Sequence, residues 1–178
     1  MKISCKTRIA LTLMLKNKKK RTHSKSLKLG TGENKIASVA YFLPTSKKYS
    51  QYVVQYLIDI SKHKLDFKLI CYSEVSSMYS ASINHSGIII SDKQLNWWGL
   101  PEQTTATQID ILNCDAIVDL NPEFDPVHAI LINKVKSSLK IGFESNWSHK
   151  LYNVTLRIDS SGFIERQYNQ INQLLGLL

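Results

Sequence analysis

The turn that follows the apolar run 114–120 concentrates the side chains best suited to chemistry. Residues 119–125 read Asp-Leu-Asn-Pro-Glu-Phe-Asp, so oxygen-bearing side chains recur at alternate positions. A calcium loop has this alternation but needs Gly at its sixth position and Glu at its twelfth, where this chain has Phe124 and Ile130. Two interpretations stay open, a small-ligand site and ordinary turn chemistry. The candidate ligand-binding residues are Asp119, Asn121 and Asp125.

The place of this turn in the chain sets what it could bind. Asp125 followed by Pro126 is typical of a helix start, because Asp caps the free amides and Pro fits the first helical position. The run 114–120 is short, apolar and flanked by two predicted helices, so we expect a central strand that ends where parallel sheets bind ligands. The helix amides favour an anion, whereas Asp119 requires a hydroxyl or a cation. We predict that Asp119 is partly exposed in a concavity near residues 143–147.

Two adjacent tryptophans, Trp97 and Trp98, stand in the stretch 92–101 and are followed by Gly99. Large aromatic side chains in a loop could stack on a sugar or a base, or anchor a partner protein. They could equally cover the edge of the hydrophobic core, with one of them partly exposed. Both residues are therefore candidate ligand-binding residues, with a covering role as the alternative.

Local motifs for catalysis or cofactor binding are absent from the sequence. It has no Gly-x-Ser-x-Gly motif and no P-loop, and Gly30-Thr31-Gly32 precedes the first predicted strand, which favours a linker over a dinucleotide site. The five His show no metal-ligand spacing, and His128, in the first turn of a predicted helix, is expected to be neutral. We predict no metal and no cofactor. Buried free thiols are expected at Cys71 and Cys114, which lie in apolar runs.

Positive charge is concentrated at the N-terminal end of the chain. Residues 1–29 contain ten Lys or Arg and no Asp or Glu, so the remaining 13 basic and 14 acidic residues leave a net charge of −1 from residue 30 onward. Such a segment binds anionic lipid or nucleic acid, or it only solubilises the protein. For lipid, Ile9, Leu13 and Met14 would insert at the interface. The candidate anion-binding residues are Lys16, Lys18, Lys19, Lys20, Arg21, Lys25 and Lys28.

The apolar run Ile9–Leu15 is too short to cross a bilayer and is followed by basic residues without a cleavage site. We therefore predict a cytoplasmic protein. If the basic segment 1–29 binds lipid, the protein is expected to be peripheral at the inner membrane. The oligomeric state and the identity of any ligand stay undetermined.

Apolar runs alternate with amphipathic segments of helical period from residue 36 onward, which predicts βαβ units and a mostly parallel sheet. The expected fold is a three-layer Rossmann-like α/β domain spanning residues 30–178, preceded by a basic helical arm over residues 1–29. Strands are predicted at 36–43, 67–72, 87–91, 114–120, 138–143 and 153–158. Helices are predicted at 46–62, 104–113, 125–136 and from residue 160 or 161 onward.

Three segments of the second half resemble the N-terminal domain of heptosyltransferase-type (family 9) glycosyltransferases. They are Asp115–Leu120, Lys140–Phe143 and Leu151–Asn153. This resemblance implies a small glycosyltransferase-like enzyme acting on a sugar acceptor. The sequence departs from that family at Pro44–Lys47, where the family has a Gly-Asp turn, and it lacks the donor-binding second half.

The whole chain also resembles a family of short, uncharacterised proteins of Bacteroidota. The shared features are the basic N-terminal helix, the stretch Ser91–Gly99, an Asp-x-x-x-Asp-Leu strand and Lys-Ile-Gly-Phe. This resemblance implies no activity. The residues therefore favour a non-catalytic binding or scaffolding protein, with the glycosyltransferase-like enzyme as the alternative. On this interpretation, the chain without residues 1–29 should fold cooperatively but lose binding to anionic vesicles or RNA.

Overall fold

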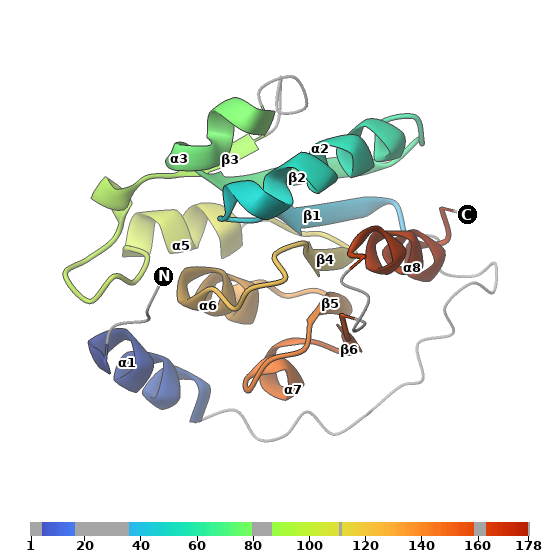
Figure 1. The fold of residues 1–178 in the computed structure, drawn as a ribbon. Helices are drawn as coiled ribbons and strands as arrows, with labels where there is room; N and C mark the ends of the chain where they lie inside the picture. The colour runs from blue at the N-terminus through green and yellow to red at the C-terminus, as the bar shows by residue number, and fades with distance from the viewer. Residues whose placement is uncertain (1–4, 17–35, 80–86, 111, 159–162, 178) are drawn as a thin grey trace.

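A six-stranded sheet lies between two layers of helices (Figure 1). The computed structural model describes residues 5–16, 36–79, 87–110, 112–158 and 163–177. The strands are β1 (Ser38–Phe42), β2 (Asp66–Tyr72), β3 (Gly87–Ile90), β4 (Ala116–Asp119), β5 (Leu139–Phe143) and β6 (Val154–Leu156). The helices are α1 (Cys5–Lys16), α2 (Lys47–Ile60), α3 (Ser73–Ser76), α5 (Gln103–Asp110), α6 (Pro126–Lys134), α7 (Ser148–Leu151) and α8 (Glu165–Leu175), with 3-10 turns η1 (Ser77–Tyr79) and η2 (Asp92–Gln94).

The strand order is β3-β2-β1-β4-β5-β6, and every neighbouring pair is parallel. This is the order of dinucleotide-binding Rossmann folds, in which ligands bind at the switch point, where the chain reverses its direction across the sheet. Here the switch point lies between β1 and β4, with Phe42 paired to Asp119 at the carboxyl end. The predicted α/β class and the parallel Rossmann-like sheet are confirmed, and β4 is central as expected.

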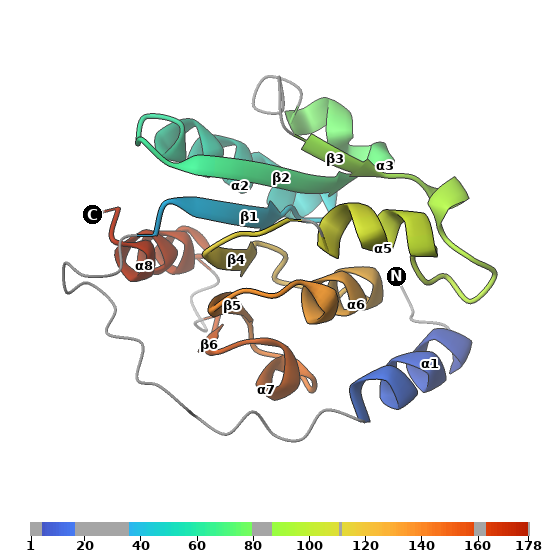
Figure 2. The same ribbon diagram turned by 180° about the vertical axis from the view of Figure 1, so that it is seen from behind.

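Each face of the sheet has its own hydrophobic core because successive side chains of a strand point to opposite faces. In β1, Val39 and Tyr41 belong to the core beneath α2 and α8. Ala40 and Phe42 belong to the core beneath α5 and α6. Figure 2 shows α5 and α6 on the face that α2 and α8 leave uncovered.

Helix α6 is buried along its first seven residues, so it needs cover on the side turned away from the sheet. Helix α1 supplies part of that cover, and both ribbon views show it beside α6 (Figures 1 and 2). The buried side chains of this outer cluster are Leu11, Leu100, Ala129, Ile130 and Leu151. The hydroxyl of Thr7 also donates a hydrogen bond to the carbonyl oxygen of Trp98, at 2.9 Å.

The packing of α1 changes the expected behaviour of the arm. The sequence predicts that residues 1–29 form an arm separate from the domain. In the structure, however, Leu11 is buried among residues of that domain. The boundary at residue 30 stays a prediction, because residues 17–29 lie outside the described ranges. Removing the arm should nevertheless expose apolar surface of α6, and the truncated chain should be less stable than the sequence alone suggests.

Candidate functional site

Asp119 lies at the carboxyl end of β4 and shares a face with Ile117, under α6. It is only 4% exposed, so the prediction of a partly exposed carboxylate in a concavity is wrong. The physical reason is that side chains from later segments cover the end of the strand. Tyr152, which follows the segment 143–147 that was expected there, supplies the contact with this carboxylate.

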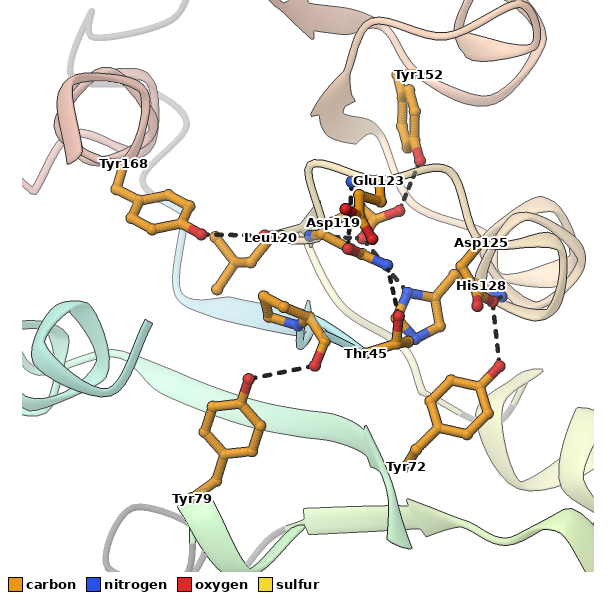
Figure 3. A network of polar contacts seen from close by, with 12 residues as sticks. Thr45, Tyr72, Tyr79, Asp119, Leu120, Glu123, Asp125, His128, Tyr152 and Tyr168 are labelled. Atoms are coloured by element: carbon orange, nitrogen blue, oxygen red, sulfur yellow. Dashed lines mark hydrogen bonds and ion pairs between the residues drawn. The ribbon is translucent and has the colours of Figure 1, made fainter. Parts of the chain in front are cut away.

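The partners of the buried carboxylate come from three segments of the chain, as Figure 3 shows. The hydroxyl of Tyr152 donates to Oδ2 at 2.7 Å, and the backbone N–H of Asn121 donates to Oδ1 at 3.1 Å. Nδ1 of His128 lies 3.5 Å from Oδ1. That distance is long for a hydrogen bond but suits an ion pair when the imidazole is protonated. The carboxylate is thus held by side chains as well as by backbone.

A glycine in the neighbouring strand makes room for Tyr152. Gly142 of β5 lies on the sheet face that Asp119 occupies in β4. A Cβ atom at residue 142 would lie 2.3 Å from Cζ of Tyr152, which is far inside van der Waals contact. The tyrosine ring therefore occupies the space that any other residue at position 142 would fill. This close approach positions the Tyr152 hydroxyl on the carboxylate of Asp119.

His128 is enclosed completely between aromatic rings and carboxylates. Its ring stacks on Tyr72 with centroids 5.6 Å apart and meets Phe42 edge-on at 5.2 Å. Burial opposes the charged imidazolium, but the carboxylates of Asp125 and Asp119 outweigh it, so the pKa of His128 is raised above its ordinary value. The neutral side chain that the sequence predicted is therefore less favoured than in an ordinary histidine, because the two carboxylates stabilise the charged form.

Asp125 confirms the predicted helix start. Its Oδ1 accepts a hydrogen bond from the backbone N–H of His128 at 2.9 Å, and Pro126 occupies the first turn of α6. The same oxygen accepts from the hydroxyl of Tyr72 at 3.1 Å. Asp125 is buried, and its contacts join the end of β2 to the beginning of α6. The contacts of its carboxylate are thus structural, because they cap α6 and hold Tyr72.

Asn121 links the two loops of the switch point. Its Nδ2 donates to Oγ1 of Thr45 at 3.4 Å, across from the loop after β1. Its Oδ1 accepts from the backbone N–H of Glu123 at 3.3 Å. Asn121 is buried, so its amide links two loops and does not line an open cleft.

Four tyrosine hydroxyls hold the carboxyl edge of the sheet. Two of them reach backbone carbonyls, because Tyr79 donates to Pro44 at 3.3 Å and Tyr168 donates to Leu120 at 3.2 Å. The other two are Tyr72 and Tyr152, which reach the carboxylates. Burial raises the pKa of all four phenols, so each stays a neutral donor near pH 7. The loops after β1 and β4 are consequently fixed in place.

A surface depression of about 710 Å³ lies at the opposite edge of the sheet, before β4 and β5 begin. It is lined by residues 113–115 and 133–138. Since open α/β sheets bind ligands at the carboxyl edge, the size of this depression does not make it the better candidate. Across the described ranges, no three His, Cys, Asp or Glu side chains are grouped to hold a metal ion.

The remaining predicted residues lie away from the polar network. Trp98 is half-buried in the cluster around Leu11, whereas Trp97 is 73% exposed. Trp98 thus covers the outer cluster, whereas Trp97 is exposed to solvent. Lys16 is the last residue of α1. The other predicted basic residues lie outside the described ranges, namely Lys18, Lys19, Lys20, Arg21, Lys25 and Lys28.

The expectation of buried free thiols is confirmed at the two cysteines of the core. Cys71 and Cys114 are both free and buried. Burial raises the pKa of Cys71 to about 11, so the thiolate that would act as a nucleophile is scarce near pH 7.

Sequence reasoning missed Tyr72, Gly142 and Tyr152, and it assigned His128 no role. The alternation of β2, β4 and β5 contains a usable signal, because Tyr72, Asp119 and Gly142 all fall on the α6 face near the carboxyl edge. Tyr152 lies in the loop after α7 and carries no such pattern. Its contact with Asp119 depends on how β5 and α7 pack.

Within the described ranges, no helix is both long enough and apolar enough to cross a membrane. A comparison with curated proteins found no match. A protein-family comparison matched residues 6–178, which is nearly the whole chain. The chain therefore belongs to DUF6913, a family of unknown function.

Proposed function

We propose that this protein is a non-catalytic binding protein that its N-terminal segment attaches to an anionic membrane surface. The observation that carries the proposal is the outward face of α1. Leu11 fixes the helix on the domain, while Ile9 and Leu13 are 54% and 62% exposed. A docked helix that presents aliphatic side chains to solvent has the form of an interfacial helix.

The charge of the same segment supplies the second attraction. Ten basic residues and no acidic residue lie within residues 1–29. Near an anionic bilayer each basic residue contributes about 1 kcal/mol, and each buried methylene adds about 0.8 kcal/mol. Binding to nucleic acid would use only the charges, because phosphate contacts need no apolar side chain. The exposed aliphatic pair therefore favours lipid over nucleic acid.

The state of the switch point supports a binding role without catalysis. Asp119, Asp125 and His128 are three of the groups there that could act as acid or base, and these three are buried among protein partners. A general base must reach a substrate proton directly or through one water molecule. In this arrangement the three groups face one another and the tyrosines.

Co-sedimentation with vesicles tests the proposal. The full chain should bind vesicles that contain an anionic lipid and should not bind vesicles of phosphatidylcholine alone. The variant Ile9→Ser/Leu13→Ser keeps every charge and should bind about tenfold more weakly or worse, since two inserted side chains are lost. The matched control is Ile58→Ser, which removes an exposed aliphatic side chain from α2, on the other face of the sheet.

Two results would contradict the proposal. The first is equal vesicle binding by the Ile9→Ser/Leu13→Ser variant and the Ile58→Ser control. The second is saturable binding of single-stranded RNA by a chain that ignores anionic vesicles, which would assign the arm to nucleic acid. The glycosyltransferase-like alternative is tested separately, because a nucleotide sugar that binds the native chain raises its melting temperature. We expect no shift at millimolar nucleotide sugar.

A further inference from the structure

Trp97 is the most exposed large apolar side chain among the residues that the structure describes. Its neighbour Trp98 already fills the covering role, since it packs in the cluster that contains Leu11. The two rings lie close, with centroids 4.7 Å apart and planes inclined at 58°. Packing of the core therefore accounts for Trp98 and leaves the exposure of Trp97 to be explained.

The turn that presents Trp97 is well built. Oδ1 of Asn96 accepts hydrogen bonds from the backbone N–H groups of Trp98 at 2.9 Å and Leu100 at 3.2 Å. The backbone N–H of Asn96 donates to the carbonyl of Leu100 at 2.8 Å, and Gly99 donates to the carbonyl of Asn96 at 2.7 Å. Gly99 has a φ of 68°, which other residues adopt only with strain. The ring at position 97 thus projects from a fixed support.

The same turn lies directly against α1. The hydroxyl of Thr7 donates to the carbonyl of Trp98, and Leu11 shares a cluster with the Trp98 ring. Figures 1 and 2 both show the segment between β3 and α5 close to α1. The turn that carries the exposed indole and the helix that carries Ile9 and Leu13 are therefore neighbours on the domain.

We propose that Trp97 is a second membrane anchor, which inserts at the lipid interface beside α1. This inference rests on the proposed function and deepens it. An indole combines a large apolar ring with an N–H donor and collects at the boundary between headgroups and acyl chains. The net positive charge of the adjoining arm complements anionic headgroups. Two anchors at separate points of one surface fix which side of the domain faces the bilayer.

The first experiment measures vesicle binding of the full chain carrying Trp97→Ser. Binding to anionic vesicles should weaken about tenfold, while the unfolding midpoint stays that of the native chain because the side chain is exposed. The matched control is Phe163→Ser, since Phe163 is also an exposed aromatic residue, at 60%, but lies just before α8. The control should bind as the native chain does.

The second experiment places the ring in the bilayer directly. Vesicles with brominated acyl chains quench an inserted tryptophan, so the difference in fluorescence between the native chain and Trp97→Phe should be quenched and shifted to the blue. Unchanged binding by Trp97→Ser together with an unquenched difference signal would overturn the inference. If Ile9→Ser/Leu13→Ser still lost binding in that case, the proposed function would stand. Loss of RNA binding by Trp97→Ser, with no effect on vesicles, would likewise overturn a lipid role.

Discussion

Replacing Gly142 by Ala tests how Tyr152 is held on Asp119. The new methyl group would lie 2.3 Å from Cζ of the Tyr152 ring, with two further ring carbons at 2.5 and 2.6 Å. The ring fills this space on the α6 face, so it must move, and its 2.7 Å hydrogen bond to the buried carboxylate is lost. The substitution at residue 142 therefore disrupts the contact between Tyr152 and Asp119, although it replaces neither residue.

Two contributions set the size of the effect on the free energy of unfolding. Overpacking a close contact costs about 1–3 kcal/mol. Loss of a hydrogen bond to a charged group costs about 1.5–3 kcal/mol. Together they predict that Gly142→Ala destabilises the protein by about 2.5–6 kcal/mol, a large part of the roughly 5–15 kcal/mol typical of a domain.

Urea unfolding of variants in three backgrounds separates these contributions. In the native background the full cost of Gly142→Ala is expected. With Tyr152→Phe the ring remains and the hydroxyl is gone, so Gly142→Ala should cost only the overpacking, about 1–3 kcal/mol. With Tyr152→Ala the space is empty, and Gly142→Ala should be neutral or stabilise by up to about 1 kcal/mol through the unfolded chain. An equal cost in all three backgrounds would refute the proposed contact.

Three further predictions concern the surrounding structure. The side chain of Lys140 is buried, and its Nζ donates to the carbonyl of Ile132 and, at 2.6 Å, to that of Val135. Lys140→Met should therefore lower the free energy of unfolding, measured in urea, by about 1–3 kcal/mol. The pKa of His128 in the folded protein is raised above 6.5, so protonated His128 stabilises the fold fully below pH 6.5, and this stabilisation is lost as pH rises through the folded pKa. The difference in free energy of unfolding between the native chain and His128→Asn should therefore shrink over that pH range in urea unfolding. Deleting residues 1–16 should lower the melting temperature and increase binding of a hydrophobic dye, because α6 loses the cover that α1 provides. Unchanged values would show instead that the arm folds independently of the domain.

The sheet could be predicted from the sequence because its strands are continuous apolar runs between helical segments. The start of α6 could be predicted for a local reason, since Asp125 and Pro126 act within a single turn. The side on which Asp119 lies also follows from alternation along β4. Its burial does not, because the Tyr152 that covers it is 33 residues away and reaches it across Gly142.

By itself, the sequence determined the class of the fold, the central place of β4 and the separation of positive charge into residues 1–29, because each depends on residue types close together in the chain. The tertiary structure alone decided three other matters: that the carboxylates of the switch point are buried against protein partners, that Leu11 is part of a core, and that Trp97 is far more exposed than Trp98. Each depends on which elements meet in space. Packing between distant segments sets those meetings, and no local pattern of residues encodes them.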